Sequence, residues 1–200
     1  MPGFDRSFVA SHLCFTPPIP TRKFTGQTII VTGSNTGMGL EAARHFARLD
    51  AAKVILAVRS LEKGQAAAAS IAASTGVQDG IVEVWELDLS RYESVTAFAQ
   101  RAAGLERLDI VVANAGVYLF DFTLAEGNET TITVNVVSTM LLALLLLPKL
   151  RGTAVRLDKE VVLMFTGSFV HAITPFKERQ AENILAGLAD PATAQMGTER

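Results

Sequence analysis

The sequence predicts an α/β fold built on a doubly wound parallel sheet, and three observations support this. Short β-branched apolar runs alternate with helix-forming segments, which is the order that right-handed crossovers require. Apolar residues make up 49% of the 200-residue chain and charged residues 19%, which fits one globular domain and excludes a disordered chain or a coiled coil. A glycine-rich segment, Thr32–Gly39, separates the first strand-like run from the first helix-like stretch.

The elements follow one another without an internal repeat. Residues 1–24 are expected to form an extended arm, because Pro17, Pro18 and Pro20 oppose both a helix and a central strand. Beyond this arm, the apolar runs and helical periodicities predict about five buried strands joined by four helices. The strands are expected at 28–31, 54–58, 81–87, 109–113 and 161–165, and the helices at 40–49, 62–73, 90–102 and 130–147.

Two local signals mark helix ends. Ser90 and Glu93 match a capping box, so the third helix is expected to begin there. Pro148 is expected to stop the fourth helix. That helix carries no charge over 131–147, but its polar residues leave it short of a membrane span, and we interpret it as a buried or interface helix. Membrane-surface contact through 140–147 is the alternative.

Charge and cysteine content exclude several classes of function. The net charge of −2 gives no basic surface for nucleic acid. Cys14 is the only cysteine and cannot form an intrachain disulfide, and with three scattered histidines it offers no metal-ligand spacing. We therefore expect no metal, and a reducing, cytoplasmic setting.

The segment from Thr32 to Gly39 is the first chemical signal. It follows the predicted first strand and opens the first helix, where Gly33, Gly37 and Gly39 would let a phosphate approach main-chain amides at a positive helix N-terminus. An ordinary strand-to-helix turn is the alternative. The position of this segment predicts a dinucleotide site, and we expect residues 25–200 to form a Rossmann-like domain.

Residues at the ends of the next strands refine this prediction. Arg59 stands where an acidic residue would bind the ribose of NAD, so its guanidinium indicates NADP rather than NAD; the alternative is a solvated surface charge. Asp88 could accept a hydrogen bond from the adenine amino group, or only cap the following helix. Asn114, with the small Ala115 and Gly116, would allow close approach to the coenzyme, or only close a turn.

Together these residues resemble the short-chain dehydrogenase/reductase family. The resemblance rests on the glycine motif, Asp88, Asn114-Ala115-Gly116, Asn135 and Thr166-Gly167-Ser168. The arm and tail are similar to the retinol-dehydrogenase-like branch found in fungal secondary-metabolite pathways. The resemblance implies hydride transfer to or from a carbonyl or alcohol. It implies coenzyme contacts from Gly33, Ser34, Asn35, Gly37, Met38, Gly39, Arg59, Asp88, Asn114, Ala115 and Gly116, and catalytic roles for Ser168, at the substrate oxygen, and Asn135, in a proton relay.

The chain departs from the family at the acid/base pair. The family uses a tyrosine with a lysine four residues later, but Tyr92 is followed by Thr96 and Tyr118 by Phe122. We therefore expect a domain that lacks the C-terminal catalytic and substrate-binding part. The alternative function is a non-catalytic module that binds a nucleotide or a partner. The fifth strand would then be an exposed edge, covered by self-association or a partner, and the substrate stays unidentified.

Overall fold

The computed structural model describes residues 14–16, 18–168, 176–194 and 196. Its centre is a five-stranded parallel sheet in the order β3-β2-β1-β4-β7. The bounds of these strands are β1 Thr28–Thr32, β2 Lys53–Val58, β3 Val82–Glu86, β4 Ile110–Ala113 and β7 Val162–Phe165. The predicted doubly wound α/β fold is confirmed, and every predicted strand is present.

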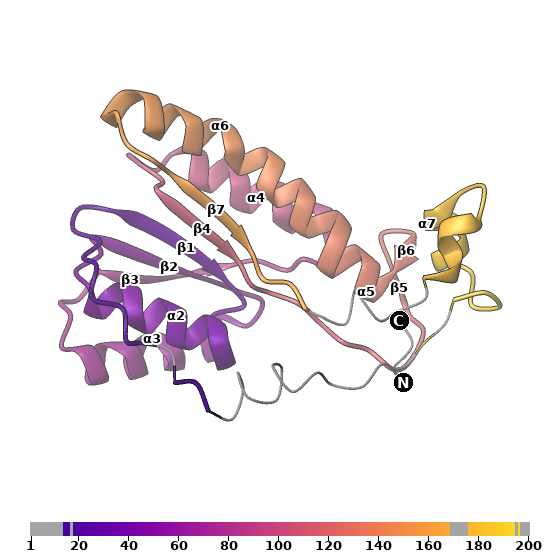
Figure 1. Cartoon of the computed structure of the whole chain (residues 1–200), viewed down its shortest axis with the longest axis horizontal. Coiled ribbons are helices and arrows are strands. Elements are labelled where there is room, and N and C mark those ends of the chain that lie inside the picture. The colour runs from indigo at the N-terminus through magenta and orange to yellow at the C-terminus, as the bar shows by residue number, and fades with distance from the viewer. Residues whose placement is uncertain (1–13, 17, 169–175, 195, 197–200) are drawn as a thin grey trace.

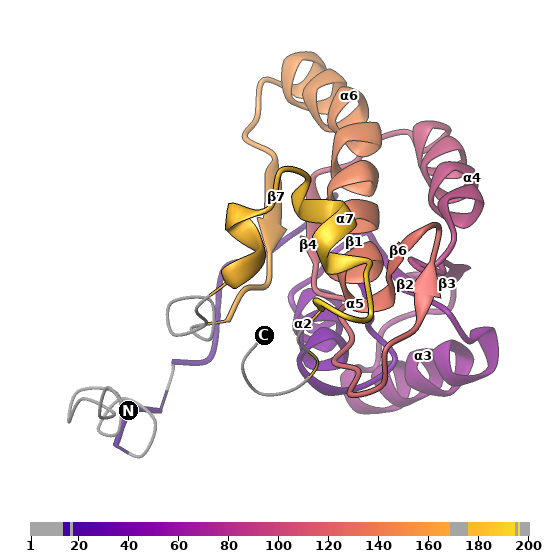
Figure 2. The same cartoon turned by 90° about the vertical axis from the view of Figure 1, so that its right-hand side faces the viewer.

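Helices cover both faces of the sheet (Figure 1). Figure 2 shows α2 (Gly37–Arg48) and α3 (Leu61–Thr75) on one side and α4 (Tyr92–Ala103) and α6 (Thr139–Leu157) on the other. Alternate residues of β1 enter different cores: Ile29 packs on the α2–α3 side and Ile30 on the α4–α6 side. Burial on both faces explains why the inner strands β1, β2 and β4 are continuous apolar runs. The edge strands β3 and β7 were also predicted to be buried, but they are more exposed because each lacks a neighbouring strand on one side.

The fourth predicted helix does not stop at Pro148. It begins as α5 (Thr130–Ile132), passes through a π-helical turn, η1 (Thr133–Ser138), and continues as α6 through Pro148 to Leu157. A proline removes one intrahelical bond, but packing beyond it outweighs that loss. Leu150 is fully buried, and the Thr153 hydroxyl accepts a 3.0 Å hydrogen bond from the Leu108 amide.

This same stretch, Thr130–Leu157, is the one helical segment of the described residues long and apolar enough to cross a membrane, judged by length and composition only. Core helices pass that test too. Leu142, Leu146 and Leu150 are buried in the core on the α4 side of the sheet, whereas Leu144 is 67% exposed. The helix therefore has a packed face and an open face, as a buried or interface helix should.

The predicted capping box is wrong. The Ser90 hydroxyl and amide both donate to Asp88 Oδ1, at 2.7 and 2.9 Å, so Ser90 does not cap the helix. Helix α4 begins at Tyr92, whose amide donates to a Glu126 carboxylate oxygen at 2.8 Å. Glu126 belongs to a two-stranded hairpin, β5 (Leu124–Ala125) and β6 (Asn128–Glu129), that was not predicted. A distant side chain thus replaces the local cap.

The ends of the chain add little to the sheet. In the described part of the arm, residues 14–16 and 18–23 are exposed and have neither helix nor strand, whereas Phe24 is half-buried with its ring 4.9 Å from that of Phe46. Residues 1–13 and 17 of the predicted arm lie outside the described residues. Beyond β7, η3 (Lys177–Gln180) and α7 (Ile184–Leu188) lie near the hairpin (Figure 1). The domain boundary at residue 24 stays a prediction. Strand β7 is an edge of the sheet, as expected, with Val162 and Met164 each 47% exposed.

Candidate coenzyme site

A cavity of about 350 Å³ opens at the carboxyl ends of β1 to β4. Parallel strands bring their carboxyl ends to one edge of the sheet, so loops far apart in sequence meet there. The cavity joins seven residues that the sequence predicted as coenzyme ligands: Gly33, Asn35, Arg59, Asp88, Asn114, Ala115 and Gly116. The prediction that these residues form one site is consistent with this geometry.

Glycine is required in the first loop for two different physical reasons. Gly33 and Gly37 have φ angles of +64° and +59°, which side chains rarely adopt. At Gly33 a side chain would also be too crowded, and at Gly39 crowding is the only reason that glycine is required. A Cβ on Gly33 would lie 2.8 Å from Ala115 Cα, and one on Gly39 would lie 2.5 Å from Asn114 Nδ2 and 2.6 Å from the Gly33 carbonyl oxygen. The loop is thus a main-chain cradle that side chains would fill.

Asn114 and Thr32 fasten this cradle to β4. The Asn114 Nδ2 donates to the Thr32 carbonyl at 3.0 Å, and the Thr32 hydroxyl accepts from the amides of Asn114 and Ala115 at 3.0 and 2.9 Å. Thr32 is 1% exposed, so these bonds lie in a dry environment where they hold geometry strongly. Thr32 begins the predicted glycine motif, and the structure adds its role, which is to set the distance between the loop after β1 and the loop after β4.

Four predicted ligands of the first loop do not line the cavity through their side chains. Ser34 is fully buried and donates to the Val31 carbonyl at 2.8 Å. Met38 is 73% exposed, and Gly37 and Gly39 lie in the first turn of α2. Main-chain amides at the helix N-terminus are the groups through which these four residues would meet a diphosphate, because anions bind there. Their ligand roles stay predictions.

The end of β2 and the start of α3 carry two cations. Arg59 and Lys63 are exposed residues that line the same cavity, with Ser60 between them. Ser60 caps α3 by accepting a 3.3 Å hydrogen bond from the Lys63 amide, so the first turn of this helix fixes the direction of the loop. Lys63 was not predicted from the sequence. Its place in the first turn of the helix that follows Arg59 was the available signal.

Asp88 lines the cavity at the end of β3, but one of its oxygens is engaged. Oδ1 accepts both hydrogen bonds of Ser90, and the Asp88 amide donates to Ser94 Oγ at 2.9 Å. The turn therefore holds the carboxylate in place. A single oxygen, Oδ2, would accept from an adenine amino group, so the structural and the binding interpretations of Asp88 are compatible.

Neither of the two predicted catalytic residues lines the cavity, although Asn135 contacts Val117, which does. Asn135 lies in the π-helical turn and holds Val117 at both ends: the Val117 amide donates to Oδ1, and Nδ2 donates to the Val117 carbonyl, each at 2.8 Å. Asn135 thus positions the loop after β4. Ser168 is exposed three residues beyond the end of β7. Their catalytic roles stay predictions.

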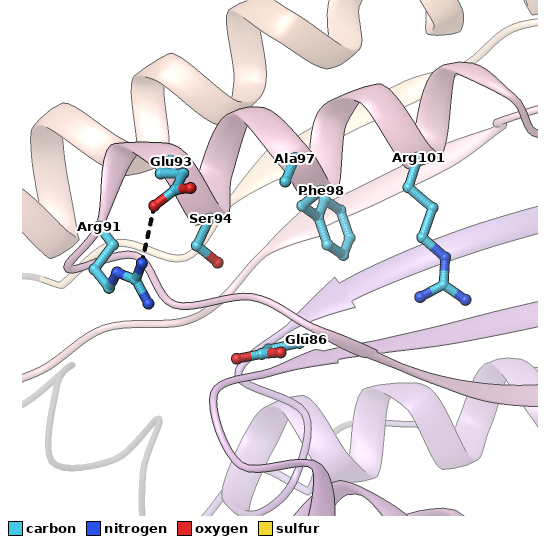
Figure 3. A pocket seen from close by; sticks show the side chains of 7 residues that line it. All are labelled: Glu86, Arg91, Glu93, Ser94, Ala97, Phe98 and Arg101. Atoms are coloured by element: carbon cyan, nitrogen blue, oxygen red, sulfur yellow. Dashed lines mark hydrogen bonds and ion pairs between the residues drawn. The ribbon is translucent and has the colours of Figure 1, made fainter.

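A second hollow, of about 310 Å³, lies between α4 and the end of β3 (Figure 3). Arg101 reaches it from α4, Arg91 from the residue just before α4, and Glu86 from β3. The Arg91 guanidinium is already paired with Glu93 at 2.9 Å. With two arginines and two glutamates lining it, this hollow lacks the positive excess that a dinucleotide phosphate requires, so it does not compete with the first cavity.

Comparison with known proteins agrees with this geometry. Residues 27–157 match the family model described as short chain dehydrogenase, so the chain belongs to the short-chain dehydrogenase family of oxidoreductases. It is 47% identical over 191 residues to the short chain dehydrogenase/reductase dmxR8 of Cryptosporiopsis sp., covering 94% of this chain and 59% of dmxR8. It is 49% identical over 183 residues to the short chain dehydrogenase atnD of Emericella nidulans, covering 90% and 57%.

Solved structures give the same fold. The oxidoreductase yciK of Escherichia coli aligns with a TM-score of 0.59 and 31% identity, covering 86% of this chain and 66% of that one. A short chain dehydrogenase of Escherichia coli CFT073, complexed with NADPH, aligns with the same TM-score and identity over 84% of this chain and 66% of its own. The chain spans 49–59% of the length of the first curated relatives it matches. The resemblance predicted from the motifs is confirmed at the level of the family.

Proposed function

We propose that the chain is the coenzyme-binding portion of an NADP-dependent oxidoreductase that transfers hydride to or from a carbonyl or an alcohol. The observation that carries the proposal is the main-chain cradle at Gly33 and Gly39, where no Cβ fits, beside two cations at Arg59 and Lys63. When bound, the nicotinamide supplies the hydride chemistry. The chain's own residues would bind the diphosphate through loop amides and the adenine through Asp88.

The preference for NADP over NAD rests on the charge at the end of β2. A 2′-phosphate would meet the Arg59 guanidinium, the Lys63 ammonium and the first turn of α3, whereas a ribose 2′-hydroxyl needs a carboxylate. The solved relatives complexed with NADPH and with NADP, both 31% identical to this chain, support the same preference.

Binding and proton transfer are separate parts of this proposal. Ser168 would hydrogen-bond the substrate oxygen where charge develops, and Asn135 would hold the loop after β4. Neither tyrosine of the 200 residues has a lysine four positions later. We therefore expect the 200-residue chain to bind the coenzyme but to show little turnover. We expect the protein to be cytoplasmic. The fungal branch that it resembles suggests a role in secondary-metabolite biosynthesis.

The test compares the affinities of NADPH and NADH by calorimetric titration of the purified 200-residue chain. NADPH is expected to bind at least about tenfold more tightly. Arg59→Ala and Lys63→Ala should each weaken NADPH about tenfold and leave NADH unchanged, because they remove only the 2′-phosphate partners. Lys159→Ala, an exposed lysine beyond α6, is the matched control. Tighter binding of NADH would overturn the NADP assignment.

A second candidate, a non-catalytic nucleotide-binding or partner-binding module, is favoured by one observation. The exposed β7 edge, with Val162, Met164 and Phe165 each more than 40% exposed, offers a surface for self-association or for a partner strand. The reading frame beyond residue 200 separates the two candidates. A tyrosine followed four residues later by a lysine in the continuing frame supports the enzyme, and a stop codon directly after residue 200 supports the module.

A further inference from the structure

The loop that follows β4 carries four large apolar side chains in succession. Val117 and Leu119 line the coenzyme cavity. The side chains between and after them do not: Tyr118 is 53% exposed and Phe120 is 67% exposed. One short segment therefore supplies a wall of the cavity and, beside it, an aromatic surface that no described part of the chain covers.

The two rings contact each other and their loop is fastened. Their centroids lie 5.0 Å apart with the planes at 77°, the edge-to-face arrangement that aromatic pairs favour. At one end of the loop Val117 is held by both polar groups of Asn135. At the other end the Thr123 carbonyl accepts from the Thr130 amide at 2.8 Å and from its hydroxyl at 3.0 Å. The loop that carries the two rings is thus held at both ends.

Exposed apolar side chains grouped beside a cavity are a feature of ligand-binding sites. The polar cradle of the cavity suits the phosphates of a coenzyme, whereas the aromatic pair suits an apolar group. We propose that Tyr118 and Phe120 form an apolar subsite for the ring-bearing part of the carbonyl substrate, next to bound NADPH. The proposal rests on the proposed function, and it assigns a substrate class: ketones or aldehydes with a planar apolar group.

The experiment titrates 2-acetylnaphthalene, and 2-pentanone for comparison, into the NADPH-saturated chain. The aromatic ketone is expected to bind at least about tenfold more tightly than the aliphatic one. Tyr118→Ala and Phe120→Ala should each weaken the aromatic ketone about fivefold to tenfold without changing the affinity of NADPH. Tyr118→Phe keeps the ring and should retain the affinity.

Leu144→Ala is the matched control, because Leu144 is equally exposed, at 67%, but lies on α6. It should change neither affinity. Unchanged binding of 2-acetylnaphthalene in both alanine variants, or no binding to the unaltered NADPH complex, refutes the subsite and leaves the proposed function standing. Failure of the chain to bind NADPH at all would refute the proposed function first and the subsite with it.

Discussion

Replacing Gly39 by alanine tests the cradle most sharply, because it should destabilise the protein, whereas the same substitution at another helical glycine should stabilise it. Gly39 lies in α2 with an ordinary backbone conformation, so helix propensity alone would stabilise the alanine variant by about 1 kcal/mol. The added Cβ would lie 2.5 Å from Asn114 Nδ2 and 2.6 Å from the Gly33 carbonyl oxygen. Relieving such crowding costs about 1–3 kcal/mol, and losing the Asn114–Thr32 hydrogen bond costs about 1 kcal/mol more.

The net expectation for Gly39→Ala is a loss of about 2 kcal/mol, a fall in Tm of roughly 4–8 °C. The affinity for NADPH should fall at least about tenfold, since the Gly33 carbonyl and the loop amides must move. Gly152→Ala in α6 is the control: its Cβ would meet nothing within 4 Å, and it should gain about 0.5–1 kcal/mol. Thermal unfolding and NADPH titration of both variants check this. A Gly39→Ala variant as stable and as tight-binding as the unaltered protein would refute the reasoning.

Two further predictions concern stability. Burial alone would raise the pKa of Glu83, but hydrogen bonds from Lys53 and Trp85 outweigh it and lower the pKa below 4.5. Glu83→Gln should therefore cost about 1 kcal/mol at pH 7, a difference that shrinks as the pH of urea unfolding falls below about 4.5; a cost independent of pH would contradict this. Pro148→Ala should raise the free energy of unfolding in urea by about 1–2 kcal/mol, because Pro148 lies exposed inside α6, and a lower free energy of unfolding would count against it.

Local patterns predicted the inner strands of the sheet well, because burial on both faces requires a continuous run of apolar residues. The apolar run at Thr28–Val31 and the glycines after it identify β1 and its loop without reference to distant residues. The grouping of Arg59, Asp88 and Asn114 could be predicted too, because parallel strands must end at one edge.

What sequence patterns missed depends on partners distant along the chain. The N-terminus of α4 is capped by Glu126, 34 residues away, so the local capping box at Ser90 was misleading. The persistence of α6 past Pro148 depends on Thr153, which holds the Leu108 amide 45 residues away. The hydrogen bond from Ser34 to the Val31 carbonyl is an exception, because its partner lies only three residues away.

Amide chemical shifts recorded during an NADPH titration test the central claim most directly, which is that the main chain of the first loop binds the coenzyme diphosphate. Saturable shifts are expected to be largest at the amides of Gly33 and Asn35 through Gly39, with smaller ones at Arg59 and Lys63. Saturable binding that leaves the amides from 33 to 39 unmoved, or a titration without saturation, would contradict it.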